Sequence, residues 1–180
     1  RAKYQEASQL STSFFSTSKW VIGRMQSLDI LRGIPTKSSK SRRPTKLLEI
    51  GAINTTLLDL RAQQSANVTP RAIDLRSSVA GVEAIDYMLF PPEEEFDVIV
   101  NSMVINSVPS PVTRGAMLQK MYSQLEEGGY LFLMLPLLCI NNSKHLTKSM
   151  FVEMVTRGVG FQEVLRKESP KIFFIVLRKV

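Results

Sequence analysis

Short runs of apolar residues alternate with amphipathic or turn-rich segments from Lys46 to the end of the chain. FDVIV and YLFLMLP are apolar on both faces, which is typical of parallel strands covered by helices on both sides. The pattern therefore predicts an α/β fold built from βαβ units. Seven runs are predicted to be strands: KLLEI, RAIDL, VEAIDY, FDVIV, YLFLMLP, FQEVL and KIFFIVLRKV.

Two helices stand out between these runs. The clearer one is predicted over 111–126, where Pro111 suits a first helical turn and the pair Gly128-Gly129 ends the helix. A second helix is predicted over 147–157. Because the KESPK turn between the last two runs is too short for a crossover helix, we expect these strands to be antiparallel. The sheet is therefore predicted to be seven-stranded and mostly parallel, with its last strands antiparallel.

The chain before the sheet divides into two parts. Apolar residues of the first part recur at spacings of three and four, at Val21, Met25, Leu28 and Leu31, as in a helix. The segment PTKSSKSRRPTK that follows holds five basic residues and no acidic one, which indicates an exposed connection. We therefore divide the chain into an N-terminal helical segment, 1–34, a basic flexible loop, 35–46, and a ligand-binding domain, 47–180.

Composition narrows the classes of function. The formal net charge of +7 favours a polyanionic partner, either nucleic acid or an anionic surface. The longest apolar run, 130–140, is far shorter than the roughly 20 residues that cross a bilayer, so no membrane partner is expected. The single cysteine, Cys139, excludes an internal disulfide and a thiolate zinc cluster, and no metal is expected. Cys139 follows an apolar run and is predicted to be buried.

Candidate ligand-binding residues follow four neighbouring strands. In doubly wound sheets, ligands bind beyond the carboxyl ends of the strands. Gly51 follows the first strand, Asp74 ends the second, Asp86 and Tyr87 end the third, and Ser102 ends the fourth. A carboxylate after the second strand can accept hydrogen bonds from ribose hydroxyls, and one after the third can bind an adenine amino group beside the tyrosine ring. Singly, each residue could equally serve a turn; their order predicts an adenosyl cofactor.

The glycine motif excludes most dinucleotide cofactors. Ala52, Ile53 and Asn54 follow Gly51 in place of further glycines, so the turn offers little to cradle a pyrophosphate. S-adenosylmethionine has no pyrophosphate. The sequence therefore favours this sulfonium cofactor over a nicotinamide or flavin nucleotide.

Several motifs together resemble one family, the fungal large-subunit (25S) ribosomal RNA adenine-N(1) methyltransferases, which are related to an animal S-adenosylmethionine sensor of growth signalling. The most specific stretch is NSMVINSVPSPVTRGAMLQKM, and LPLLCINNSK, LLEIG, IDL and DYM add to it. The resemblance covers nearly the whole chain. It implies a Rossmann-like class I methyltransferase fold and S-adenosyl-L-methionine as the cofactor, bound by Gly51, Asp74, Asp86, Tyr87 and Ser102.

The resemblance also implies a substrate side. Asn106 and Asn142 are the candidate catalytic residues, and Arg114 is either an acceptor-side residue or a cation on a helix surface. Ser107, Leu138 and Phe90 depart from the family pattern, which has an aromatic residue, a proline and an arginine there.

The implied function is methylation of an adenine N(1) in ribosomal RNA. The partner is then the pre-ribosome, the location the nucleus and nucleolus, and the chain is expected to act as a monomer. The basic loop 35–46 is a candidate for holding RNA phosphates. The alternative is a non-catalytic sensor that binds the same cofactor and acts through a protein partner.

Overall fold

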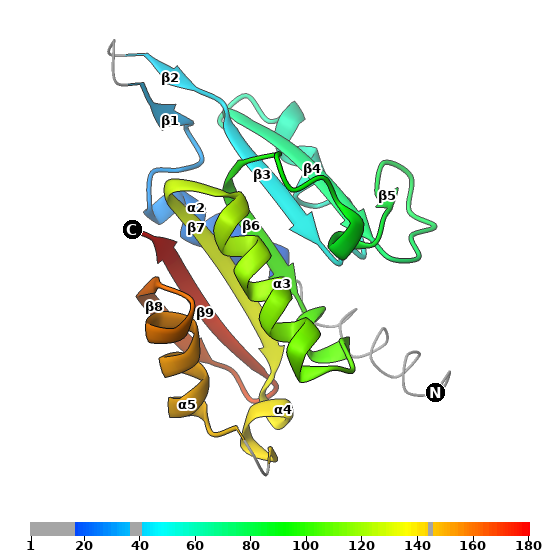
Figure 1. Ribbon diagram of the computed structural model, residues 1–180. Coiled ribbons are helices and arrows are strands. Elements are labelled where there is room, and N and C mark those ends of the chain that lie inside the picture. Colours follow the sequence, from blue (N-terminus) through cyan, green and yellow to red (C-terminus); the bar gives the residue numbers. More distant parts are fainter. Residues whose placement is uncertain (1–16, 37–40, 144–145) are drawn as a thin grey trace.

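The computed structural model describes residues 17–36, 41–143 and 146–180, and its centre is a seven-stranded sheet (Figure 1). The strand order is β5-β4-β3-β6-β7-β9-β8. All neighbours from β5 to β7 are parallel, whereas β9 is antiparallel to both β7 and β8. The predicted α/β sheet is confirmed. Its strands are β3 (Thr45–Ile50), β4 (Val68–Asp74), β5 (Glu83–Ala84), β6 (Phe96–Ser102), β7 (Leu125–Pro136), β8 (Phe161–Glu168) and β9 (Ile172–Lys179).

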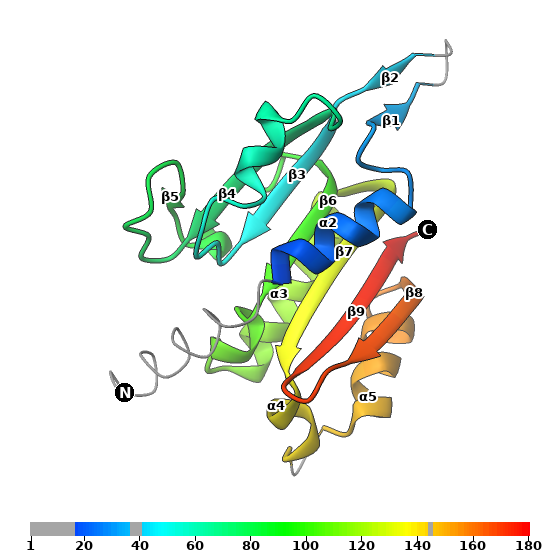
Figure 2. The same cartoon turned by 180° about the vertical axis from the view of Figure 1, so that it is seen from behind.

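Helices cover both faces of the sheet, as predicted. In Figure 1, α3 (Pro111–Gln124) and α5 (Lys148–Glu153) lie in front of the sheet. Figure 2 shows α2 (Thr17–Ser27) crossing the opposite face. The shorter elements are η1 (Leu58–Ala62), η2 (Tyr87–Leu89), η3 (Ile105–Ser107), α4 (Leu137–Asn141) and the π-helical turn η4 (Met154–Gly158), which continues α5.

The face under α2 is packed by aliphatic and aromatic side chains. Val21 and Met25 are fully buried there, one helical turn apart. The Trp20 ring lies 4.7 Å from the Phe174 ring and 6.1 Å from the Phe132 ring, centroid to centroid. Because β7 and β9 contribute these two rings, α2 is fixed across the middle of the sheet.

Helix α3 starts as predicted and ends earlier than predicted. The Ser110 hydroxyl caps it by accepting a hydrogen bond from the Thr113 amide, with Pro111 in the first turn. The helix ends at Gln124, because Leu125 already pairs with Phe96 in the sheet. The pair 128–129 therefore lies inside β7. A Cβ on Gly129 would approach two backbone oxygens to 2.8 and 3.0 Å, so strand packing explains this glycine.

The segment predicted to be a flexible loop, 35–46, is structured in its described part. Strand β1 (Ile34–Pro35) pairs antiparallel with β2 (Arg42–Arg43), and β3 already starts at Thr45. The Arg42 side chain binds Asp29 at 2.6 Å. This partner is 13 residues away, and the RR pair alone does not reveal it. The flexibility of the loop as a whole stays a prediction. The remainder of the loop, 37–40, and residues 1–16 of the N-terminal segment lie outside the described residues.

Arg43 and Asp97 form the polar link that fastens this hairpin to the sheet. The Asp97 carboxylate accepts two hydrogen bonds from the Arg43 guanidinium, at 2.6 and 2.7 Å, and one from the Lys46 amide at 2.9 Å. Its side chain is 5% exposed. A carboxylate so deeply buried depends on such partners, because burial removes its hydration.

Replacing Arg43 should therefore be costly. We expect Arg43→Met to lower the free energy of unfolding by about 2 to 4 kcal/mol, because Asp97 stays buried without its cation. Arg42→Met is the matched control. Its partner Asp29 is 60% exposed, so we expect a loss of at most about 1 kcal/mol. Urea denaturation measures both, and equal losses would contradict this role for Asp97.

Candidate functional site

The predicted ligand-binding residues form a row along one edge of the sheet. The carboxyl ends of β5, β4, β3 and β6 are consecutive neighbours in the strand order. From β3 the chain passes to β4 on one side, and it returns later to place β6 on the other side. The strand order thus reverses between β3 and β6, which is where doubly wound folds bind their ligands.

Glu49 is a buried carboxyl at this edge with a strongly perturbed pKa. It lies in β3, two residues before Gly51, and is only 4% exposed. No described residue supplies a hydrogen bond to its Oε2 atom. Burial raises the pKa of the carboxyl from 4.5 to about 8. Because the raised pKa belongs to the folded state, the ligand-free fold should lose stability as the pH rises from 4.5 toward 8.

Gly51 follows β3 in a backbone conformation that favours glycine, with φ at +80°. A Cβ at this position would lie 2.2 Å from Cγ2 of Val104 and 3.1 Å from the Ser102 carbonyl oxygen. The missing side chain is therefore required by the loop after β6. The sequence placed Gly51 among the cofactor-binding residues, and that role stays a prediction beside the contact with Val104.

Asp74 and Asp86 each use one carboxylate oxygen locally. Oδ1 of Asp74 accepts a hydrogen bond from the Arg76 amide at 2.9 Å, and Oδ1 of Asp86 accepts one from the Met88 amide at 2.8 Å. These contacts form the turns that the sequence left as an alternative. The second oxygen of each carboxylate receives no hydrogen bond from the described part of the chain. The local turns therefore orient two carboxylates without using up their capacity to bind a ligand.

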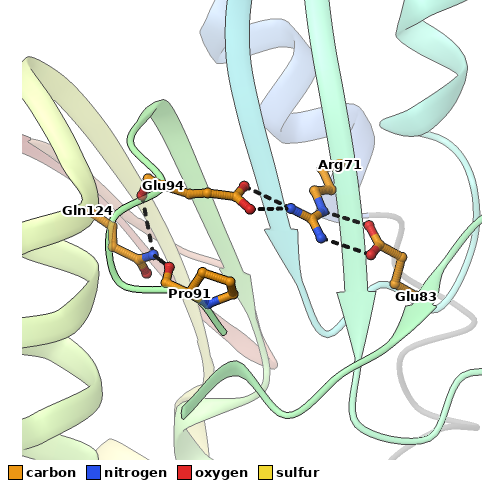
Figure 3. A network of polar contacts seen from close by, with 5 residues as sticks. All are labelled: Arg71, Glu83, Pro91, Glu94 and Gln124. Atoms are coloured by element: carbon orange, nitrogen blue, oxygen red, sulfur yellow. Dashed lines mark hydrogen bonds and ion pairs between the residues drawn. The ribbon is translucent and has the colours of Figure 1, made fainter. Parts of the chain in front are cut away.

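A polar network holds the segment that carries Asp86 (Figure 3). Arg71 of β4 binds both carboxylate oxygens of Glu83, at 2.6 and 2.9 Å, and both of Glu94, at 2.8 and 2.7 Å. The amide of Gln124, from α3, donates to the Pro91 and Glu94 carbonyls. The hydrogen bond from Arg71 lowers the pKa of Glu83. This network explains how β5, which has two residues where the sequence predicted a strand over 82–87, keeps its place.

Tyr87 follows β5, and its side chain is buried in the core. Its side chain is 3% exposed, and its hydroxyl donates a 2.7 Å hydrogen bond to Gln124 of α3. Burial raises the pKa of this hydroxyl. The Lys120 ammonium sits 5.1 Å from the ring centroid and donates to the carbonyls of Met88 and Phe90. The tyrosine ring is thus part of the core under α3, and its contact with an adenine ring stays a prediction.

The end of β6 and the loop after it bring Ser102, one of the predicted ligand-binding residues, to the switch point. Asn101 is fully buried, and its Oδ1 accepts a hydrogen bond from the Ile105 amide at 3.3 Å, so it shapes the loop from within. The Ser102 hydroxyl lies 3.1 Å from the hydroxyl of Thr17, the first residue of α2. Met103 has a φ of +59°, which is strained for a residue with a side chain. The sequence gives no indication that Ser102 contacts Thr17, because the two residues are 85 positions apart.

The predicted acceptor-side residues are spread over three elements. Asn106 lies on η3, and its Oδ1 is buried without a hydrogen bond from any described residue. Arg114 lies in the first turns of α3, close enough to α4 to lower the pKa of the Cys139 thiol against the larger effect of burial, which raises it. Asn142 follows α4 and is exposed. Cys139 is exposed as well, so the prediction that it is buried was wrong.

The described residues include no group of three or more His, Cys, Asp or Glu side chains that could hold a metal ion. No helix among them is long and apolar enough to cross a membrane.

The solved structures with a similar fold include two methyltransferases that contain S-adenosylhomocysteine. The 1,6-didemethyltoxoflavin-N1-methyltransferase of Burkholderia thailandensis, with bound S-adenosylhomocysteine, superposes with a TM-score of 0.63 at 15% identity, over 98% of this chain and 90% of that one. N-methyltransferase NodS of Bradyrhizobium japonicum WM9, in complex with S-adenosylhomocysteine, gives 0.57 at 19% identity, over 77% and 79%. At these identities the likeness shows the fold alone. The predicted Rossmann-like methyltransferase fold is confirmed.

Comparison of the amino-acid sequence identifies relatives more specifically than comparison of the fold. A 25S rRNA (adenine(2142)-N(1))-methyltransferase of Saccharomyces cerevisiae is 30% identical over 131 residues, which are 71% of this chain and 38% of that protein. The chain thus spans well under half the length of this relative. The model of the family described as 25S rRNA (adenine(2142)-N(1))-methyltransferase, Bmt2, matches residues 1–180. The chain therefore belongs to the Bmt2 family of 25S rRNA (adenine(2142)-N(1))-methyltransferases.

Proposed function

We propose that the chain binds S-adenosylmethionine at the carboxyl edge of its sheet and transfers the methyl group to N1 of an adenine in large-subunit ribosomal RNA. The observation that carries the proposal is the buried Glu49 carboxyl, whose Oε2 has no partner among the described residues, at the switch point of a chain of this family. A buried polar atom without a partner is costly unless a ligand satisfies it. The names of the yeast relative and of the solved neighbours support the same activity.

The residues along this edge fit the cofactor. When bound, S-adenosylmethionine supplies a methyl group on a positively charged sulfur. The second oxygens of Asp74 and Asp86 suit the ribose hydroxyls and the adenine amino group, as expected from their strand positions. Glu49, once ionised, suits a cationic group of the cofactor. The Ser102 hydroxyl can bind the cofactor once it gives up its hydrogen bond with the Thr17 hydroxyl.

Methylation at adenine N1 demands positioning more than proton transfer. This nitrogen carries a lone pair at neutral pH, so no general base is needed. Holding nucleophile and methyl group in line contributes several kcal/mol to catalysis, on the order of 7 or more in favourable cases. Because N1 lies on the pairing edge, the adenine must be single-stranded or extruded before it reacts. The buried Oδ1 of Asn106 suits the adenine amino group beside N1, and Asn142 remains a candidate at the rim.

We also propose a binding partner and a cellular location for the chain. Large-subunit ribosomal RNA is made and assembled in the nucleolus, so the partner is the pre-ribosome and the location is the nucleus and nucleolus. We propose that the chain acts there as a monomer.

The methyl-transfer assay separates enzyme from sensor. Incubation with tritiated cofactor and ribosomal RNA that lacks the modification should label an adenine, and mapping should place the label at N1. Asn106→Ala should reduce kcat by at least about 10-fold, with cofactor affinity unchanged, because a hydrogen bond to the acceptor base is lost. A protein that binds the cofactor and labels no RNA would instead be a sensor.

Cofactor affinity should depend on Asp74. We expect Asp74→Ala to weaken binding of S-adenosylmethionine by about 10- to 100-fold, because charge-assisted hydrogen bonds are lost. Titration calorimetry measures the change. Glu153→Ala, which removes an exposed carboxylate from α5, is the control and should bind as the wild type does. Unchanged affinity in folded Asp74→Ala would place the cofactor elsewhere.

Binding should also release a proton from Glu49. The carboxyl is mostly protonated at neutral pH in the free protein, because burial raises its pKa to about 8. A bound cation favours the ionised form, so affinity should rise as the pH rises from about 6 to about 8 and level off above. Calorimetry in buffers of different ionisation enthalpy counts the released proton. Glu49→Gln should abolish both effects, and a persistent release would assign the proton to another group.

A further inference from the structure

The α2 face of the sheet carries four basic side chains that have no acidic partner within the described part of the chain. Lys19 and Arg24 are exposed on α2, Arg32 follows that helix, and Arg61 is exposed on η1. Leu57 and Leu60, around η1, pack in the same buried cluster as Val21 and Met25 of α2, so both elements cover one face (Figure 2).

Acidic groups offset only part of this charge. Asp29 is paired with Arg42, whereas Asp59 accepts a hydrogen bond from Thr55 and has no ion pair among the described residues, so it offsets at most one of the four cations. On the opposite face three cations are paired: Arg157 with Glu153, Arg166 with Glu163, and Lys148 with Glu168. Arg114 and Lys120 of α3 have no ion pair within the described part of the chain. The four cations therefore leave the α2 face with a net positive charge exposed to solvent.

A polar hollow of about 620 Å³ lies within this face. It opens between the end of α2 and the turn before β4, which are joined by a 2.8 Å hydrogen bond from the Asn67 amide to the Leu31 carbonyl. Its polar lining consists of Gln26, Asp29, Arg32, Gln63 and Ser65. Amides, a hydroxyl and a guanidinium around an open hollow are the groups that contact phosphates and sugars in RNA complexes.

Helix α2 connects the hollow with the methyl-transfer edge. Thr17, at its start, contacts Ser102, whereas Gln26, near its end, lines the hollow. Gln26 lies nine residues after Thr17 in this helix, so the two residues are about 14 Å apart along the helix axis at about 1.5 Å per residue. Lys19 and Arg24 lie between them. A strand of RNA whose adenine reaches the edge at Ser102 can thus run along α2 for a few nucleotides and end at the hollow.

We propose that this surface, formed by Lys19, Arg24, Arg32, Arg61 and the hollow, binds the phosphates of the RNA strand that flanks the target adenine. The inference rests on the proposed function for its substrate class. It replaces part of the role first suggested for the basic loop 35–46, because the guanidinium groups of Arg42 and Arg43 are already bound to Asp29 and Asp97.

The test removes three charges from this surface and three from the opposite one. The triple variant Arg24→Gln, Arg32→Gln and Arg61→Gln alters the α2 face. The matched control Lys148→Gln, Arg157→Gln and Arg166→Gln has the same formal net charge. Affinity for a short radiolabelled RNA that contains the unmodified adenine is measured by filter binding over a salt series. Circular dichroism verifies the fold, and calorimetry with S-adenosylmethionine is run on the same samples.

We expect the α2-face variant to bind RNA about 10- to 100-fold more weakly at low salt, with the slope of log K against log salt reduced by about 2 to 3. The control should keep the wild-type slope. Equal losses in both variants, or none in the first, would overturn the proposal. So would polyglutamate that binds as tightly as RNA and through the same three residues, because the surface would then suit an acidic protein.

The two proposals can fail separately. If wild-type protein binds no S-adenosylmethionine and the RNA results are as expected, the proposed function fails and the RNA surface remains. If cofactor binding and methyl transfer are found while the α2-face variant binds RNA normally, only the surface is wrong.

Discussion

The contact between Gly51 and Val104 is the constraint on which the carboxyl edge of the sheet depends. The loop after β6 folds back over the end of β3 so closely that a Cβ on Gly51 would lie 2.2 Å from the valine side chain. The same turn sends the Gly51 amide to the Ile73 carbonyl of β4 at 2.8 Å. One residue thus joins three strands at the switch point. Glu49 is buried two residues before this turn, and η3 with Asn106 follows the loop that carries Val104.

Much of the fold follows from the order of apolar runs. FDVIV and YLFLMLP became the central strands β6 and β7, since only a sheet covered on both faces can bury both sides of such runs. The end of α3 could not be predicted from these runs. Gly128 and Gly129 looked like a helix stop, whereas they serve the start of β7 beside Asp97. A glycine signals an unusual backbone or a close contact, and the sequence does not say which.

The candidate site was predictable to the level of strand ends. Asp74, Asp86 and Ser102 lie where parallel strands must bring them, because carboxyl ends of parallel neighbours meet at one edge. The burial of Tyr87 was not predictable, since it depends on Gln124 of α3, 37 residues away. Glu49 did carry a signal: a single acidic residue inside the apolar run KLLEI must either be exposed or ionise with difficulty.

Trp20 has a practical consequence. It is the one tryptophan of the chain, and its ring packs between α2 and the sheet against Phe132 and Phe174. The ring is partly buried, and its indole N–H is buried and finds no hydrogen-bond acceptor among the described residues. Its emission therefore comes from a single environment in which the N–H is shielded from water. Lifting α2 off the sheet would admit water to the indole and shift the emission to longer wavelength. Intrinsic fluorescence can thus follow the seating of this helix in real time without any label.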